Sequence, residues 1–307
     1  MNVLVMGAGG VGGYFGALLA RLGHRVTVIA RGPHLDAMQR SGLRVETVIE
    51  PAFTVAVHAL SGAEPNVVAD LVLFTVKSYD TDEGIARIRT AVGPRTTILT
   101  LQNGVDSGES LAAAFGWERV LEGVVYIESH VGAPGVIAQI GGPRRVIFGR
   151  RAGNGEREIE LLHSFTEAGW NAELSEAILR DLWTKLCFIG PFAAANTITG
   201  LSAERMCLVE RCERLVQMVM AEFAAVSAAE GAGLPADAVE TAMDRFRGFK
   251  GMSSMLRDRA GGKRLESEAL VGSTVRRGTA RGIPTPVTES LYSLLTPMRD
   301  GGADRLG

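Results

Sequence analysis

The sequence has few cysteines and almost no net charge. Its three cysteines, Cys187, Cys207 and Cys212, are too few for a disulfide framework and lack the spacing of a metal site. They fit a reducing compartment, so we expect a cytoplasmic location and no bound metal. The formal net charge is −2, which argues against nucleic acid as a partner because its recognition needs a basic face.

The sequence also lacks the signs of export or membrane insertion. The opening MNVLVMGAGG has neither a positively charged segment nor a cleavage site, so we expect no signal peptide. One uncharged stretch, Leu186 to Ala203, is 18 residues long, which is enough to raise the question of a membrane span. It contains Gly190, Pro191 and Asn196, however, so we expect a buried helix and no membrane partner.

Lysine is scarce, which makes each lysine informative. Only four of the 32 basic residues are lysine, and arginine carries the rest of the positive charge. The four are Lys77, Lys185, Lys250 and Lys263. A lysine retained in such a chain is a candidate for chemistry that arginine cannot perform, such as releasing a proton near neutral pH.

Length and composition favour two globular domains. The 307 residues are about twice the usual domain length. Hydrophobic residues make up 46% and charged residues 21%, as in ordinary globular proteins. Glycine is abundant, at 38 of 307 residues, and indicates a fold with many tight turns and close backbone approaches.

The first half of the chain alternates apolar strands with helices. This order is typical of an α/β Rossmann fold with a doubly wound parallel sheet. We expect strands at residues 2–6, 25–30, 70–76, 96–101, 120–126, 136–140, 145–148 and 171–174. We expect helices at residues 12–22, 35–40 and 156–168.

From Ser175 onward nearly every segment has a helical pattern. We expect helices at residues 176–197, 204–230, 236–246, 266–281 and 288–298, and a frayed end at 299–307. The sequence therefore predicts a Rossmann domain over residues 1–172 and an all-helical domain over 173–307. The helical domain could form a homodimer, although no apolar stripe is diagnostic of one.

A glycine-rich turn follows the first strand. Gly7, Gly9 and Gly12 form the pattern G-x-G-x-x-G between a strand and a helix, which is the context that a dinucleotide site needs. Gly7 permits the tight turn, Gly9 lets a pyrophosphate approach the backbone, and Gly12 lets helix and strand pack closely. We therefore assign Gly7, Gly9, Gly10 and Gly12 to a cofactor site. The alternative is a glycine-rich turn without a ligand.

The end of the second strand indicates which dinucleotide binds. NAD sites usually place an acid there, which bonds the ribose 2′-hydroxyl. Here the strand ends in Arg31, and the first acid after it is Asp36. An arginine suits a 2′-phosphate, so we expect NADPH rather than NADH. Arg31 could instead be a solvated charge at a strand end.

Three polar positions fall where a substrate crevice is expected, outside the carboxyl ends of the strands. Lys77 and Asn103 each follow an apolar strand, and Lys185 lies on an apolar helix of the second domain. Burial would lower the pKa of Lys185 toward neutrality and make its ammonium a usable proton donor. The alternatives are a lysine that extends to solvent and an ion pair with Asp181.

Taken together, these positions resemble the ketopantoate reductase family, the 2-dehydropantoate 2-reductases. The resemblance covers nearly the whole chain, and the combination of motifs in this order is far more specific than any single one. The motifs are Gly7–Gly12, Arg31, Thr75-Val-Lys77, Gln102-Asn103-Gly104, Pro134-Gly135-Val136, Leu182-Trp-Thr-Lys185-Leu, Ser253-Ser-Met-Leu256, Arg257-Asp258, Glu266, Arg276-Arg277 and Gly282-Ile283-Pro284-Thr-Pro286.

The resemblance implies reduction of a small 2-oxo acid by NADPH, with ketopantoate and pantothenate synthesis as the leading assignment. It implies that Lys185 donates the proton and that Asn103 lies between nicotinamide and substrate. It also implies that Lys77 lines the cofactor crevice and that Ser254 binds the substrate. Glu266 is expected at the edge shared by cofactor and substrate, where it can bond a hydroxyl group.

One departure from the family pattern bears on the substrate. The family usually carries two asparagines, one and two turns after the lysine, where this chain has Ile189 and Ala193. Apolar pockets discriminate weakly between substrates, so a related enzyme that reduces a more apolar 2-oxo acid is one alternative. A second alternative is an NADPH-binding sensor without turnover, although the retained Lys185 and Glu266 argue against it.

Overall fold

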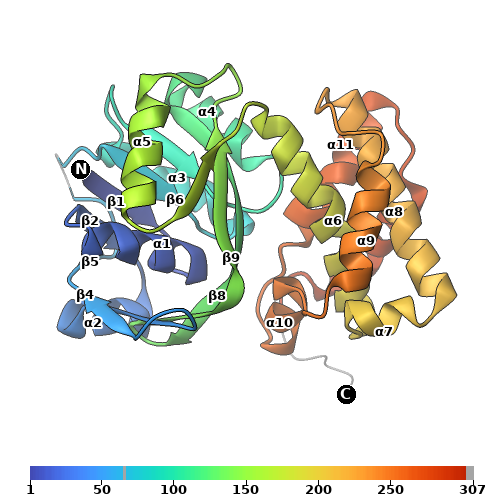
Figure 1. Cartoon of the computed structure of the whole chain (residues 1–307), viewed down its shortest axis with the longest axis horizontal. Helices are drawn as coiled ribbons and strands as arrows, with labels where there is room; N and C mark the ends of the chain where they lie inside the picture. The colour runs from blue at the N-terminus through green and yellow to red at the C-terminus, as the bar shows by residue number, and fades with distance from the viewer. Residues whose placement is uncertain (65–66, 302–307) are drawn as a thin grey trace. The chain divides into compact units, whose positions relative to one another are not determined.

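Apolar strands from the first half of the chain pair into one ten-stranded sheet in the computed structural model, which describes residues 1–64 and 67–301 (Figure 1). The strand order is β4-β3-β9-β8-β7-β6-β1-β2-β5, with β10 beside β9. The strands are β1 (Asn2–Met6), β2 (Arg25–Ile29), β3 (Leu43–Thr47), β4 (Phe53–Val55), β5 (His58–Leu60), β6 (Leu71–Phe74), β7 (Thr97–Thr100), β8 (Val120–Ala133), β9 (Val136–Gly149) and β10 (Asn171–Leu174).

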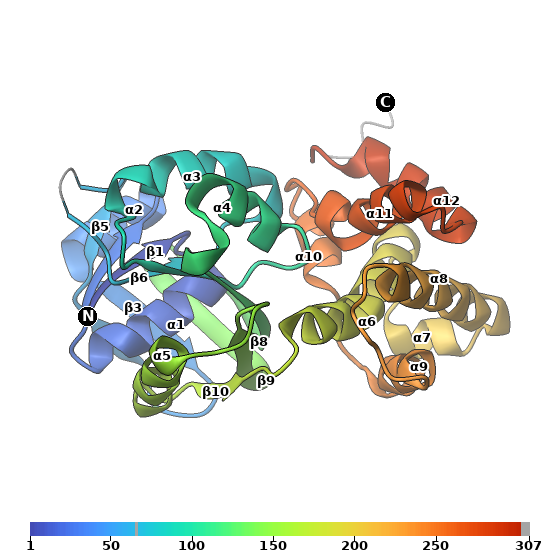
Figure 2. The ribbon, with the colours of Figure 1, turned by 90° about the horizontal axis from the view of Figure 1, so that it is seen from above.

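The centre of the sheet is parallel, and helices cover both of its faces (Figure 2). Strands β6 and β7 are buried along their whole length, as parallel strands between two helical layers should be. Apolar residues of α1 and α5 pack on one face, and those of α3 and α4 pack on the other. The helices are α1 (Gly10–Arg21), α2 (Gly32–Ser41), α3 (Thr81–Ile88), α4 (Ser107–Phe115) and α5 (Glu156–Glu167). This arrangement confirms the Rossmann architecture.

The sheet is mixed rather than wholly parallel, which the sequence did not predict. Strands β8 and β9 form a long antiparallel hairpin, and β3 and β4 also pair antiparallel. The strands expected at 136–140 and 145–148 are one strand, β9, because the chain stays paired through the segment between them. Gly142 and Arg144 absorb the irregularity there with φ values of 79° and 53°. Gly141-Gly-Pro143 therefore bends the strand instead of ending it.

The chain divides into two units. The first contains residues 1–102 and 107–178, and the second contains 103–106 and 179–307. The predicted border between residues 172 and 173 falls within β10, which pairs with β9 and belongs to the first unit. Residues 302–307 of the expected frayed end lie outside the described residues.

In its described part, the secondary structure of the second unit consists of helices, as expected. It begins with the long helix α6, whose start is later than predicted because the Ser175 hydroxyl accepts the Ala177 N–H in a preceding turn. The helices are α6 (Ile178–Thr199), α7 (Ala203–Cys207), α8 (Glu210–Ala229), α9 (Ala238–Gly248), α10 (Ser254–Ala260), α11 (Ser273–Arg281) and α12 (Pro286–Leu295).

Two expected helices are interrupted. The helix predicted at 204–230 breaks between α7 and α8, where Val209 is extended. The helix predicted at 266–281 begins as a π-helical turn, Glu268–Gly272, before α11. The short helix α10 was not predicted, and its start is capped by Ser253, whose hydroxyl accepts the Leu256 N–H.

Helix α6 continues through Pro191 and packs closely on the π-helical turn. A Cβ atom on Gly190 would lie 2.5 Å from the Leu270 carbonyl oxygen and 2.5 Å from the Phe223 ring. Glycine is therefore needed here for close approach rather than for its backbone angle. Over residues 1–64 and 67–301, no helix combines the length and apolar character needed to cross a bilayer.

Gly190→Ala should destabilise the second unit by about 1–3 kcal/mol, because the added methyl group has no space. Gly248→Ala is the matched control, since no atom lies within 4 Å of its Cβ position. That exchange should leave stability unchanged or raise it by about 0.4–1 kcal/mol. Urea unfolding of both variants checks the prediction, and equal effects would contradict the close packing of α6.

Candidate active site

The turn between β1 and α1 has the geometry that its glycines predict. Gly7 adopts a φ of 100°, which side chains rarely tolerate. The Thr75 hydroxyl donates to the Gly7 carbonyl oxygen at 2.8 Å. A Cβ atom on Gly12 would lie 2.1 Å from that hydroxyl oxygen and 2.3 Å from the Gly7 carbonyl oxygen. Gly12 therefore lets α1 pack directly against the turn.

Gly9 and Gly10 differ in their surroundings. A Cβ atom on Gly10 would lie 2.4 Å from the Ser129 carbonyl oxygen, so Gly10 faces the backbone of β8. Gly9 is the N-cap of α1, and no atom lies within 4 Å of its Cβ position. The first turn of α1 carries neither a capping side chain nor an acid. An open, positive helix end of this kind fits the phosphates of a dinucleotide.

His34 holds the glycine-rich turn from α2, a contact that sequence reasoning missed. The Gly135 N–H donates to His34 Nδ1 at 2.9 Å. His34 Nε2 must then carry the proton, and it donates to the Ala8 carbonyl oxygen at 2.9 Å. The neutral imidazole thus links the turn to the β8–β9 hairpin. No sequence pattern marks this residue, because both partners are backbone groups.

Arg31 follows β2 and Lys77 follows β6, the two strands that pair with β1. Arg31 is the N-cap of α2, and its side chain is 75% exposed. Its guanidinium donates to Asp80 at 3.3 Å. Lys77 is the N-cap of the short 3₁₀ turn Ser78–Asp80, and two residues separate it from the end of β6. The first turn of α2 has no acid, so Arg31 and this helix end together offer positive charge to an anion.

The second unit brings Lys185 and Asn103 together. Lys185 lies on α6 between the buried side chains of Trp183 and Leu186. Its ammonium nitrogen Nζ donates to Asn103 Oδ1 at 2.7 Å. Asn103 belongs to the segment 103–106, which the second unit holds. The two residues, which the sequence marked separately, are thus joined by a direct hydrogen bond.

Burial and two neighbouring charges set the acidity of Lys185. Burial lowers the pKa of its ammonium to about 8, while the Glu266 carboxylate raises this pKa and the Arg245 guanidinium lowers it. Glu266 is itself 5% exposed and precedes the π-helical turn. A lysine with a pKa near 8 can give up a proton at physiological pH, which an ordinary lysine does poorly.

Ser254 is positioned by α10 rather than by the residues around Lys185. It is the exposed first residue of α10. The buried side chain of Asn196 fixes the preceding residue, because Asn196 Oδ1 accepts from Ser253 N–H at 2.9 Å and from the Ser253 hydroxyl at 2.6 Å. Asn196 therefore anchors the start of α10, a structural role that its sequence position alone did not reveal.

The helix face next to Lys185 is apolar. Ala193 is buried, and Ile189 is partly buried. Phenylalanines from α6, from α9 and from the residue that follows α9 pack against one another in stacked, tilted and edge-to-face pairs. They are Phe188, Phe192, Phe246 and Phe249. The guanidinium of Arg245 lies 4.7 Å from the centre of the Phe188 ring.

Two family models match the chain along most of its length. "Ketopantoate reductase PanE/ApbA" matches residues 3–153, and "Ketopantoate reductase PanE/ApbA C terminal" matches residues 177–299.

Individual relatives agree with the family models. A 2-dehydropantoate 2-reductase of Halobacterium salinarum is 32% identical over 310 residues, covering 98% of this chain and 100% of the relative. The crystal structure of a PanE/ApbA family ketopantoate reductase from Ralstonia eutropha JMP134 has a TM-score of 0.89 at 36% identity, covering 97% of this chain and 98% of that one. D-mandelate dehydrogenase, solved with NADH and anilino(oxo)acetate, shares the fold, with a TM-score of 0.88 at 22% identity over 97% of each chain.

Two substitutions should move the pKa of Lys185 in opposite directions from its value of about 8. Glu266→Gln should lower it, because the lysine loses a carboxylate that favours its charged form. Arg245→Gln should raise it, because a like charge disappears. Titration of isotope-labelled lysine by NMR checks both shifts, and the low lysine content simplifies assignment. Shifts of the same sign, or none, would contradict the described electrostatics.

Proposed function

The chain belongs to the ketopantoate reductase family, and from this premise we propose that it reduces the 2-oxo group of 2-dehydropantoate with NADPH. Membership of the family makes it an oxidoreductase. The observation that carries this more specific proposal is the partly buried Lys185, whose ammonium donates to Asn103 and whose pKa is about 8. The proposal includes a place in pantothenate synthesis and a cytoplasmic location.

NADPH fits the groups at the glycine-rich turn. The open space at Gly9 and the acid-free start of α1 suit its pyrophosphate. Arg31 at the start of α2 suits its 2′-phosphate, and its exposed pairing with Asp80 costs little to exchange. We assign Lys77 to the same crevice. When bound, NADPH supplies the hydride that reduces the carbonyl carbon.

Lys185 completes the reduction by moving a proton. Hydride addition turns the C2 carbonyl into an alkoxide, whose negative charge the ammonium stabilises. Lys185 Nζ then donates its proton to that oxygen, which yields the hydroxyl group of a 2-hydroxy acid and leaves a neutral amine. The amine regains a proton from solvent. Asn103 Oδ1 accepts one ammonium hydrogen and so directs the remaining ones.

The remaining assignments concern the substrate. We assign Ser254 to binding one end of the 2-oxo acid, since it is exposed at the start of α10. We assign Glu266 to hydrogen bonding with a hydroxyl group of the substrate or the cofactor, because its carboxylate also raises the pKa of Lys185. Asn103 contributes to both substrate and cofactor binding.

The apolar face at Ile189 and Ala193 supports a second candidate, reduction of a more apolar 2-oxo acid. Neither side chain can bond a substrate hydroxyl, and the same helix carries the buried rings of Phe188 and Phe192. An NADPH sensor without turnover has less support. A protein that only binds cofactor has no need of a lysine with a lowered pKa.

Substrate choice is tested by NADPH oxidation with 2-dehydropantoate and with branched and aromatic 2-oxo acids. We expect a kcat/KM above ~10⁴ M⁻¹s⁻¹ for the true substrate. Ile189→Asn, which introduces an amide at the family position, should shift preference toward 2-dehydropantoate. Preference of the unchanged enzyme for an apolar acid would replace the leading substrate with the second candidate. No turnover of any acid, with NADPH bound, would favour the sensor.

Lys185→Ala should lower kcat by about 10²–10⁴-fold, because the reaction loses its proton donor. NADPH affinity should change little, since the phosphate-binding groups lie on β1, α1 and α2. Stopped-flow turnover together with a fluorescence titration of NADPH separates the two effects. Lys185→Arg is the matched control for charge, and it should be nearly as slow because arginine does not release its proton. Unchanged turnover in either variant would remove Lys185 from the mechanism.

A further inference from the structure

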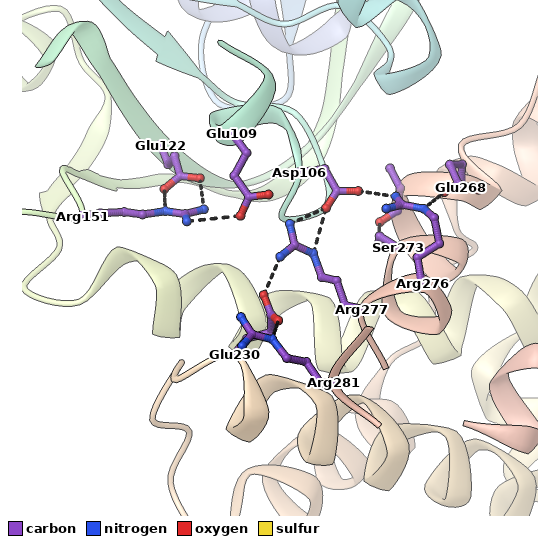
Figure 3. Close-up of polar contacts among 11 residues, drawn as sticks. Asp106, Glu109, Glu122, Arg151, Glu230, Glu268, Ser273, Arg276, Arg277 and Arg281 are labelled. Atoms are coloured by element: carbon purple, nitrogen blue, oxygen red, sulfur yellow. Dashed lines mark hydrogen bonds and ion pairs between the residues drawn. The ribbon is translucent and has the colours of Figure 1, made fainter. Parts of the chain in front are cut away.

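A network of arginines and carboxylates in the second unit takes no part in the reaction steps above (Figure 3). Arg276 Nη2 on α11 donates to Asp106 Oδ2 at 2.7 Å. The neighbouring Arg277 donates from Nε and Nη2 to Asp106 Oδ1, at 2.9 and 2.7 Å. Both oxygens of Asp106 are therefore held by α11. Arg277 also bonds Glu230 at the end of α8.

Arg276 differs from Arg277 in its second partner. Its Nε donates to Glu268 Oε1 at 2.6 Å. Glu268 begins the π-helical turn, and its other oxygen accepts the hydroxyl of Tyr292 from α12. One guanidinium thus bridges the segment 103–106 and the start of the π-helical turn. A planar guanidinium can hold two carboxylates in fixed positions, which an ammonium does poorly.

The two bridged segments carry the two groups that favour the charged form of Lys185. Asp106 closes the segment that Asn103 begins, and Glu268 follows Glu266 closely in the chain. The segments also touch directly, because a Cβ atom on Gly104 would lie 2.9 Å from the Ala269 carbonyl oxygen. Arg276 therefore fastens two pieces of backbone that already pack against each other.

We propose that Arg276 is a positioning residue, which holds the segments of Asn103 and Glu266 together so that both face the ammonium of Lys185. This inference rests on the proposed role of Lys185 as proton donor. Arg276 acts at a distance through its carboxylate partners, and it touches neither substrate nor cofactor in the proposed reaction.

The charges around Lys185 predict the direction in which its pKa should change when the bridge is lost. The charged groups that act on Lys185 are the carboxylate of Glu266 and the guanidinium of Arg245, and the Asn103 oxygen adds a hydrogen bond. If the bridge is lost, the ammonium loses support from Asn103 and Glu266 while Arg245 on α9 stays in place. The pKa of Lys185 should then fall. General loosening that admits water would instead raise it, because burial is what lowers it.

Arg276→Gln tests the inference, with Arg281→Gln as its matched control. Both side chains lie on α11 and are similarly exposed, at 57% and 55%. Arg281 bonds Glu230 at 2.8 Å, so its loss also removes an ion pair from the same network. The measurement is the NMR titration of Lys185 in the full chain, beside a thermal melt of each variant.

We expect the Lys185 pKa to fall by about one unit in Arg276→Gln and to stay unchanged in Arg281→Gln. Arg276→Lys should give an intermediate shift, because an ammonium keeps the positive charge but lacks the planar guanidinium that holds two carboxylates. An unchanged pKa in Arg276→Gln, a rise toward the ordinary lysine value, or an equal fall in Arg281→Gln would each overturn the inference. The titration needs no turnover, so its outcome is independent of whether the enzyme reduces 2-dehydropantoate.

Discussion

The hydrogen bond from the Lys185 ammonium to the Asn103 side chain is the interaction on which the proposed chemistry depends. Burying an ammonium is costly unless a partner satisfies it, and here an amide oxygen at 2.7 Å and the carboxylate of Glu266 do so. The balance between burial and these partners leaves a pKa of about 8. A lysine in this state is charged enough to stabilise an alkoxide and acidic enough to protonate it.

The packing of the second unit explains how that ammonium is held. Helix α6 carries Lys185, and Gly190 lets the same helix approach the π-helical turn closely. Glu266 lies just before that turn, and the segment from Asn103 to Asp106 rests against it through Gly104. The close contacts of Gly190 and Gly104 are therefore both made with the π-helical turn that follows Glu266. In the first unit, Gly12 likewise permits close packing, whereas Gly9 leaves space at the helix start where a phosphate fits.

Features with a local signal could be predicted from the sequence, and features that depend on distant pairing could not. The glycine-rich turn was predictable because strand, turn and helix follow one another directly. Lys185 stood out through its apolar neighbours and the scarcity of lysine. By contrast, Asp106 and Arg276 are 170 residues apart in the chain, and each resembles an ordinary surface charge. Their bridge appears only when α11 and the segment after β7 come together.

The same distinction accounts for the secondary-structure predictions that were wrong. The pairing of β8 with β9 carries the chain through Gly141-Gly-Pro143, which in isolation signals a turn. The π-helical turn before α11 likewise depends on its tertiary contacts, since its residues have an ordinary helical pattern. His34 gave no signal because it bonds only backbone groups.

The pH dependence of kcat/KM for reduction, measured beside the NMR titration of Lys185, tests the central claim most directly. The proposed reduction needs the protonated lysine, so activity should fall as pH rises through about 8, the pKa of that residue. The kinetic and spectroscopic values should coincide, and both should move to lower pH together in Glu266→Gln. A kinetic limb that stays in place while the lysine titration moves would show that another group donates the proton.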